Sequence, residues 1–313
     1  MVTRRWRLAL SGALLALGSP ARGEDLLLDA ASGHIVVATV NGVALRLRVA
    51  LDAQGYVVLN REAAQRARLG RGDRRTTMAI GPVRLKGHAA KQPVTIGGTE
   101  QLLFLHWYDA PVDQQADGVI SPGLLPYDRV SLRYRPAETA RESRYRVQLS
   151  TDDGLHVPVR VNGAYSIAAR FSPTAPFTVA TGAAAAMMAE THGGTLSSHG
   201  ERAEIGFGVR RPTRWLSFAQ PVRVGDIAIR RLLMRTGDFL GEHRLPASGE
   251  HDVTGDVIVT ASGERQKAVY RMTLGTDVLG ICSEAEYRRA ERDLTLRCRW
   301  RAAAASYSRR SPG

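Results

Sequence analysis

Two turns in this 313-residue chain carry polar side chains that could hold or activate a water molecule. Asp52 follows the apolar stretch 43–51, and Ser172 follows a similar stretch about 120 residues later. A carboxylate can accept a proton from a bound water. A serine hydroxyl does not ionise at neutral or acidic pH, so Ser172 could hold a water molecule but could not exchange protons usefully with Asp52. The alternative role for Asp52 is an ordinary turn aspartate that bonds its own backbone.

Each turn belongs to a repeated unit. An Asn-Gly pair, the strongest short signal for a β-hairpin, precedes each turn at Asn41-Gly42 and Asn162-Gly163. A helix-like segment follows each turn, at 61–69 and at 181–190. In the second copy Thr181 is placed to cap this helix and the glycines at 193 and 194 to end it.

The two copies also end alike. Strand-rich stretches cover 76–106 and 204–236, and each is followed by a closing segment, at 117–125 and at 272–279, that leads into a final strand. Two copies of one supersecondary unit predict two lobes, and a cleft between lobes is the default place for a site.

The first 23 residues have the pattern of a secretory signal. A basic start precedes the apolar run Leu8 to Leu17, and Ala21-Arg22-Gly23 matches a small-x-small cleavage site. That run is too short to span a bilayer. We therefore expect a periplasmic or secreted protein without stable membrane insertion. The expected parts are a signal peptide (1–23), a first lobe (24–150), a second lobe (151–300) and a flexible tail (301–313), with a linker at 136–145.

The formal net charge of +13 includes four arginines from the first 23 residues, which carry no acidic residue. No basic run is interleaved with aromatic residues, and no helix-turn-helix or zinc-finger pattern is present, so we expect no nucleic-acid partner. A weak attraction to anionic polymers of the cell envelope stays open, because a basic exported protein meets such surfaces.

Cys282 and Cys298 are the only cysteines. In an oxidising compartment such a pair predicts a disulfide, and two reduced, buried thiols are the alternative. We expect no metal site, because further cysteines are lacking and His243, His251 and Asp252 do not have the helical spacing of a metallohydrolase. Phosphate-loop and dinucleotide patterns are also missing, so no cofactor is expected.

The order of these elements resembles the bacterial retropepsin-like aspartic peptidases, here as a tandem within residues 34–300. In that family the first turn of each lobe reads Asp-Thr/Ser-Gly-Ala-Ser/Pro, which matches here only as Asp52-Ala53-Gln54-Gly55. The second turn matches through residues 175–179, which puts Ser172 where the second aspartate should be, or Pro173 after a one-residue slip. The resemblance implies an all-β fold with two similar retropepsin-like or pepsin-like β-barrel lobes and short helices.

The resemblance also implies how the chemistry would work. One carboxylate from each lobe shares a proton, so that one activates a water and the other donates to the scissile carbonyl. Neither Ser172 nor Pro173 can supply the second carboxylate. The hydroxyl and the glycine that should follow each aspartate are also replaced, by Ala53 and Gln54 in the first copy and by Pro173 and Thr174 in the second.

Three functional hypotheses follow. The first is an exported, catalytically degenerate pseudo-peptidase that binds an extended peptide or an envelope partner in the interlobe cleft. The second is an active aspartic-type endopeptidase that uses Asp52 and an unrecognised second carboxylate, for which Asp117 and Asp277 are candidates if they are not solvated loop aspartates. The third is an unrelated β-rich envelope protein.

Four aromatic residues flank the expected cleft or flap regions. For each of them, packing in the core or at its edge is the alternative to a binding role. They are Trp107, Tyr108, Trp215 and Phe218.

Overall fold

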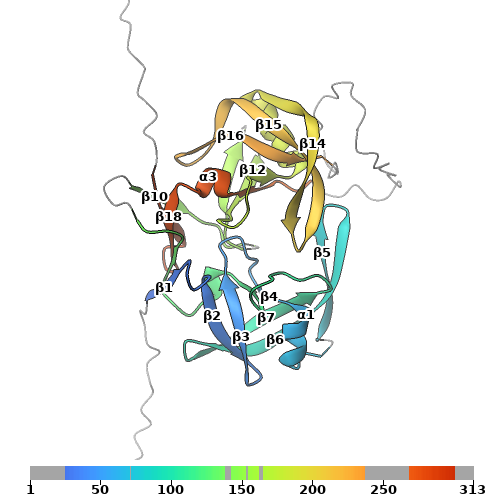
Figure 1. Ribbon diagram of the computed structural model, residues 1–313, viewed down its shortest axis with the longest axis vertical. Helices are drawn as coiled ribbons and strands as arrows, with labels where there is room; N and C mark the ends of the chain where they lie inside the picture. The colour runs from blue at the N-terminus through green and yellow to red at the C-terminus, as the bar shows by residue number, and fades with distance from the viewer. Residues whose placement is uncertain are drawn as a thin grey trace, which may run out of the picture.

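The computed structural model describes residues 25–70, 72–137, 142–152, 154–161, 165–236 and 268–299. These residues form two seven-stranded sheets and one five-stranded sheet, with short helices (Figure 1). The expected signal peptide and tail lie outside the described residues, as do the Asn162-Gly163 turn, His243, His251 and Asp252. Among the residues that are described, no helix has the length and apolar character needed to cross a membrane.

The first lobe is a sheet in the order β2-β3-β8-β4-β7-β6-β5. At its start, Asn41 and Gly42 both have positive φ, 48° and 77°, as a type I′ hairpin turn requires. A second pairing, between β2 and β6, closes the sheet into a barrel. Its elements are β2 (Ile35–Val40), β3 (Val43–Val49), β4 (Val57–Leu59), α1 (Arg61–Arg66), β5 (Arg74–Ile80), β6 (Val83–Ile96), β7 (Thr99–Tyr108) and β8 (Gly118–Ile120).

The second lobe repeats this topology strand for strand, in the order β11-β12-β17-β13-β16-β15-β14. In each lobe the third strand of the order runs parallel to the second and antiparallel to the fourth. The predicted all-β fold of two similar lobes is therefore confirmed. The elements are β11 (Val157–Val161), β12 (Tyr165–Phe171), β13 (Val179–Ala180), α2 (Gly182–His192), β14 (Gly194–Gly206), β15 (Val209–Val224), β16 (Ile227–Arg235) and β17 (Arg271–Leu274).

The third sheet draws its strands from both halves of the chain, in the order β1-β9-β18-β19-β10. Residues 143–145, expected in a linker, instead pair with β19, so the predicted linker was too long. The strands are β1 (Asp25–Asp29), β9 (Arg129–Arg133), β10 (Ser143–Gln148), β18 (Cys282–Arg288) and β19 (Asp293–Cys298); the 3-10 helix η1 (Pro122–Leu124) precedes β9, and α3 (Thr276–Leu279) precedes β18.

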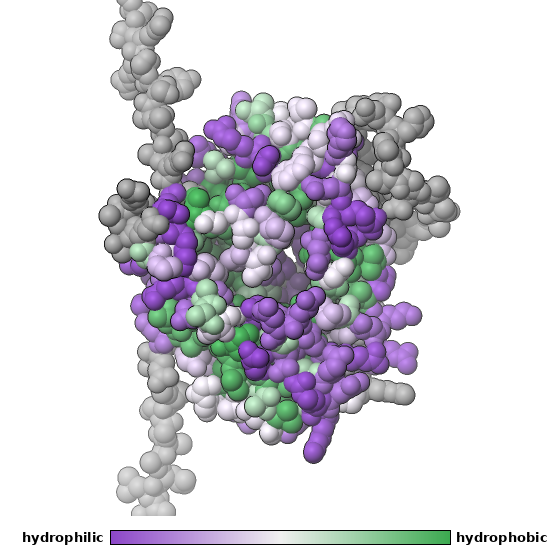
Figure 2. All heavy atoms as spheres, in the orientation of Figure 1, coloured by the Kyte–Doolittle hydropathy of each residue, from purple (hydrophilic) through white to green (hydrophobic). Residues whose placement is uncertain are grey.

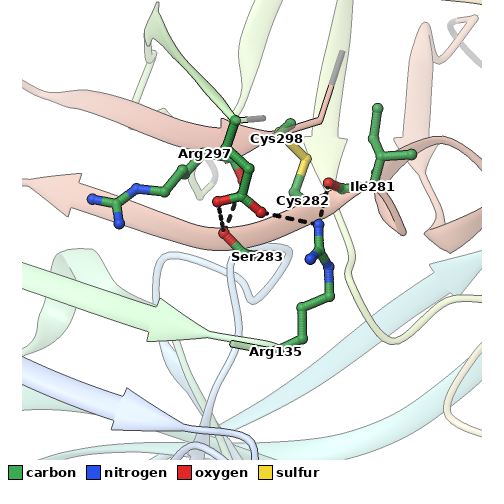
Figure 3. The surroundings of a disulfide bond; sticks show 7 residues. Arg135, Ile281, Cys282, Ser283, Arg297 and Cys298 are labelled. Carbon is green, nitrogen blue, oxygen red and sulfur yellow. Dashed lines mark hydrogen bonds and ion pairs between the residues drawn. A yellow bond between two sulfur atoms is a disulfide. The ribbon is translucent and has the colours of Figure 1, made fainter. Parts of the chain in front are cut away.

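The predicted disulfide is present in this third sheet. Cys282 and Cys298 face each other across β18 and β19, with an S–S distance of 2.03 Å (Figure 3). Beside the disulfide, Arg135 Nη2 donates to the carbonyl oxygen of Ile281 at 2.7 Å. Arg135 follows β9 of the first half, so this contact and the strand pairing together join the two halves of the chain.

Helix α2 begins and ends close to the predicted positions. Thr181 is its N-cap residue, but the side chain bonds the carbonyl oxygen of Val269 instead of capping the helix. Gly193 ends the helix with a φ of 68°, a left-handed conformation that glycine adopts without strain. Residues 182–189 are all buried, so this alanine-rich helix lies inside the second lobe and contacts β11, β14, β15 and β16.

Candidate functional site

Asp52 lies in the turn that connects β3 to β4 in the first lobe. The turn leaves the sheet where Ala50 N donates to the carbonyl oxygen of Ile120 at 3.0 Å, and Ala53 N then donates to the carbonyl oxygen of Ala50 at 3.2 Å. Leu51 and Ala53, on either side of Asp52, are buried. Asp52 itself is mostly buried but keeps some contact with solvent. The turn therefore holds the carboxyl group at the edge of the core.

Ser172 lies at the end of β12 in the second lobe and is 2% exposed. Its hydroxyl lies near enough to the Asp52 carboxyl group to lower the pKa of that group. The same hydroxyl accepts from Ala175 N at 3.3 Å. The structure thus brings together the two residues that sequence analysis singled out, one from each lobe.

The two residues do not occupy equivalent register positions. Ser172 N donates to Leu274 just as Ala50 N donates to Ile120, so Ser172 matches Ala50 when counted from the preceding strand. Counted back from the helix start, where Asn60 corresponds to Thr181, Ser172 matches Leu51. The two connecting turns therefore differ by one residue, and Asp52 lies further along its turn than Ser172 does.

Two further side chains surround the pair. Arg170, on β12, is 7% exposed, and its Nη1 donates to the main-chain oxygen of Asp52 at 3.4 Å. Tyr134 follows β9, and its hydroxyl is buried without a hydrogen-bond partner among the described residues. It is close enough to Asp52 for the carboxylate charge to affect the pKa of the phenol. Neither residue was predicted, because nothing in the local sequence indicates that these strands meet at Asp52.

Burial dominates the electrostatics of the site. Loss of solvation raises the pKa of Asp52, although the Ser172 hydroxyl, the backbone amide of Asp52 and the Arg170 charge all act to lower it. Burial, together with the Asp52 charge, raises the pKa of Tyr134, so this phenol stays protonated. The site therefore combines one carboxyl group with neutral hydroxyls and a guanidinium.

The two candidate second carboxylates have other partners. Asp117 Oδ2 accepts from Arg46 N at 2.8 Å, and Asp117 also pairs with Arg66 of α1. Asp277 Oδ1 accepts from both the backbone amide and the hydroxyl of Thr178, each at 2.8 Å. Asp277 thus braces the second-lobe turn, which sequence analysis did not foresee.

Glycines allow two close backbone approaches near the site. A Cβ atom at Gly154 would lie 2.8 Å from the carbonyl oxygen of Ala53, in the Asp52 turn. A Cβ atom at Gly275 would lie 2.4 Å from the carbonyl carbon of Phe177. The first-lobe counterpart of Gly275 is Ser121, whose hydroxyl instead accepts from Gly123 N at the start of η1. The serine at this position in the first lobe thus goes with a different packing of the two closing segments.

Three of the four aromatic residues expected near the cleft belong to the interior. Trp107, Tyr108 and Phe218 are 5%, 2% and 7% exposed. Trp215 is partly exposed and lies between Phe177, 5.5 Å away edge to face, and the guanidinium of Arg231, 4.8 Å above its ring. Within the described ranges, no group of three or more His, Cys, Asp or Glu side chains is arranged to hold a metal ion.

Comparisons with known proteins find similarity to solved structures. No family model matches the chain, and no curated protein matches it. A similar solved structure is the retroviral protease-like domain of Ddi1 from Leishmania major, at 25% sequence identity and a TM-score of 0.23. The match covers 28% of this chain and 70% of that chain.

This arrangement limits the available chemistry. Asp52 can take up or release one proton, and the hydroxyl of Ser172 can orient a water or a polar ligand group beside it. A proton shared between two carboxylates needs a second acid within hydrogen-bond reach. Beside Asp52 the structure places the hydroxyl of Ser172 and the guanidinium of Arg170, neither of which is a carboxyl group.

Proposed function

We propose that this is an exported, aspartic-peptidase-like protein without peptidase activity, which binds an extended peptide or an envelope partner between its two lobes. The observation that carries the proposal is that the hydroxyl of Ser172 lies near the carboxyl group of Asp52. Where the peptidases that this chain resembles have two carboxylates, this site has a carboxylate and a hydroxyl.

The missing carboxylate removes the acid–base cycle. In a dyad, one carboxylate is the base while the other carries the proton that is donated to the peptide carbonyl. Ser172 cannot take either role, because its hydroxyl does not titrate in the range where a carboxyl pair works. Each positioned acid or base contributes roughly 10²–10⁴-fold to the rate, so a site with half the dyad is expected to be inactive.

Two edge strands support peptide binding. β5 and β14 are the outermost strands of their sheets, and each belongs to a long hairpin. An exposed sheet edge offers unpaired backbone groups that an extended peptide can join as an added strand. Figure 2 shows the surface hollowed near the centre of this face, between the lobes.

The test measures cleavage and binding together. Mature wild-type protein and Asp52→Asn are incubated with reduced, denatured casein across about pH 3–7, the range in which carboxyl pairs titrate. We expect no cleavage by either protein, but retention of casein peptides by both on an affinity column. Cleavage by the wild type that disappears in Asp52→Asn would instead establish the active endopeptidase. Failure of both proteins to retain any peptide would contradict the binding function.

The proposed export draws support from the disulfide, because such bonds persist in oxidising compartments. N-terminal sequencing of protein recovered from the periplasm or medium should give a chain that begins at or near Glu24. Recovery of the uncleaved chain from membranes would contradict a cleaved signal.

A further inference from the structure

The hairpin of β14 and β15 reaches from the second lobe to the first. Its tip is Gly206, Phe207 and Gly208, and the Phe207 ring lies 5.7 Å from the ring of Tyr108, edge to face at 83°. Tyr108 ends β7 of the first lobe and is 2% exposed. In Figure 1 this hairpin extends from the second lobe toward β5 of the first.

The tip rests on a group of aromatic rings in the first lobe. The Tyr108 hydroxyl lies 3.3 Å from Nδ1 of His106, and the His106 ring stacks on Tyr56 at 3.8 Å. Tyr56 belongs to the same turn as Asp52, four residues further along the chain. We call Tyr56, His106 and Tyr108 the aromatic cluster. Tyr56 connects this cluster along the chain to the turn that carries Asp52.

The backbone at the tip is unusual. Phe207 has a φ of 55°, between glycines with φ of 152° and 68°. A bulky residue with positive φ is a conformational outlier, which persists only where surrounding contacts compensate for its cost. Glycine would adopt this conformation more easily, so the sequence retains a phenylalanine where the turn alone disfavours one. The contact with Tyr108 is the compensating interaction.

The β14–β15 hairpin has few buried contacts that would hold it against the first lobe. Most of β14 is exposed, and its outer edge has no neighbouring strand among the described residues. Segments with few buried contacts open at a small free-energy cost. Because the tip meets the first lobe through the Phe207 ring, it can separate from that lobe while the rest of the second lobe stays folded.

We propose that Phe207 is a latch that closes over the aromatic cluster. Its ring occupies the position that an aromatic side chain of the extended peptide ligand takes when the ligand binds. This assignment rests on the proposed peptide-binding function and adds to it the ligand class: a peptide with an aromatic residue that packs against Tyr108. Opening of the hairpin exposes the cluster, and the ligand's ring replaces that of Phe207.

The first measurement needs no ligand. Hydrogen exchange of the β14–β15 tip is compared in the wild type, Phe207→Ala and Phe207→Tyr. The control is Phe104→Ala, which removes an exposed aromatic ring, 46% accessible, from β7 of the first lobe. Loss of an aromatic pair should raise exchange at the tip about tenfold in Phe207→Ala. Phe207→Tyr and Phe104→Ala should match the wild type. Unchanged exchange in Phe207→Ala would overturn the latch.

The second measurement uses two fluorescent ten-residue peptides that are identical except for Phe or Ala at one central position. We expect Phe207→Ala to bind the Phe peptide several-fold more tightly than the wild type does, with little change for the Ala peptide. Equal affinities in both proteins, or weaker binding of the Phe peptide by Phe207→Ala, would overturn the assignment of Phe207 as a stand-in for the ligand.

The two measurements separate this inference from the proposed function. Faster exchange at the tip without binding of either peptide by any variant would contradict the peptide-binding function and the ligand assignment, while it would support the closing contact. Peptide binding that is insensitive to Phe207 would support the proposed function and overturn the latch.

Discussion

The two lobes share one strand order but complete their cores in different ways. In the first lobe β2 pairs with β6, so backbone hydrogen bonds close the barrel, and α1 is a short helix of six residues. In the second lobe β11 and β15 are in contact, but no ladder joins them within the described residues, and the 11-residue helix α2 packs against both. In the second lobe, packing of the buried helix α2 thus replaces part of the strand pairing that closes the barrel of the first lobe.

The turns that carry the site differ in a related way. In the second lobe Thr178 and Asp277 brace the turn through hydrogen bonds, and Gly275 N also donates to the Thr178 hydroxyl at 3.1 Å. The strand registers place Val57 at the position of Thr178 in the first lobe, where it is fully buried. The first turn is therefore held by apolar packing, and the second by a polar network.

The largest test of this comparison removes a side chain from α2. Met187 is fully buried, so Met187→Ala should lower the free energy of unfolding by about 2–5 kcal/mol. The matched change in the first lobe, Ala63→Gly in α1, should cost only about 1 kcal/mol. Urea denaturation followed by circular dichroism measures both. A loss below that of Ala63→Gly would show that α2 does not carry the second core.

An intermediate effect is expected from exchanging the residues of the two turns. Thr178→Val removes the hydroxyl that links Asp277 to Gly275, and should cost about 1–3 kcal/mol because buried polar groups lose their partners. The reverse change, Val57→Thr, should also destabilise by about 1–3 kcal/mol, since it buries a hydroxyl without such a network. Thermal unfolding would detect both losses. A neutral Thr178→Val would mean that the second turn is also held by packing alone.

The smallest effect concerns the pH dependence of stability. Burial raises the pKa of Asp52 in the folded protein, so the folded state binds its proton more readily than the unfolded state. Stability from this group is present at low pH and is lost as the pH rises from about 3.8, the ordinary aspartate value, through the folded pKa.

Asp52→Asn should therefore stabilise the protein at pH 7, by less than about 1 kcal/mol, and have no stabilising effect at pH 3. Urea unfolding at the two pH values measures the difference. The control Asp277→Asn should lose stability at pH 7, because hydrogen bonds to a charged acceptor are the stronger ones. A stabilisation by Asp52→Asn that is equal at both pH values would rule out burial of the charge as its cause.

Local signals made much of the fold predictable. The Asn41-Gly42 turn, the helix that begins after Thr181 and the Cys282–Cys298 disulfide each depend on a few neighbouring residue types, and all three are present. The repeat predicted two lobes because corresponding segments have corresponding patterns. The helix that begins at Arg61 was also located correctly, although it ends at Arg66, three residues earlier than expected.

The missed features depend on partners that are distant in sequence. β1 pairs with β9, and β10 with β19. Because these partners are far apart in sequence, no local pattern predicts the third sheet. The one-residue difference between the turns is set by strand register, which sequence similarity does not fix. Arg170 and Tyr134 meet Asp52 for the same reason. The repeat led us to expect Ser172 opposite Asp52, but it gave no indication of the buried surroundings that raise the pKa of Asp52.

The third sheet also dictates an order of assembly. β10 lies near the middle of the chain and pairs with β19, the last strand that the structure describes, which ends at Cys298. While the chain is being synthesised, β10 must wait for about 150 further residues before it can pair. Such distant pairings form slowly. Completion of the sheet, and oxidation of Cys282 with Cys298, are therefore late events in folding. Late completion of the sheet would suit a chain that is exported in the unfolded state, because the sheet would not have to unfold before export.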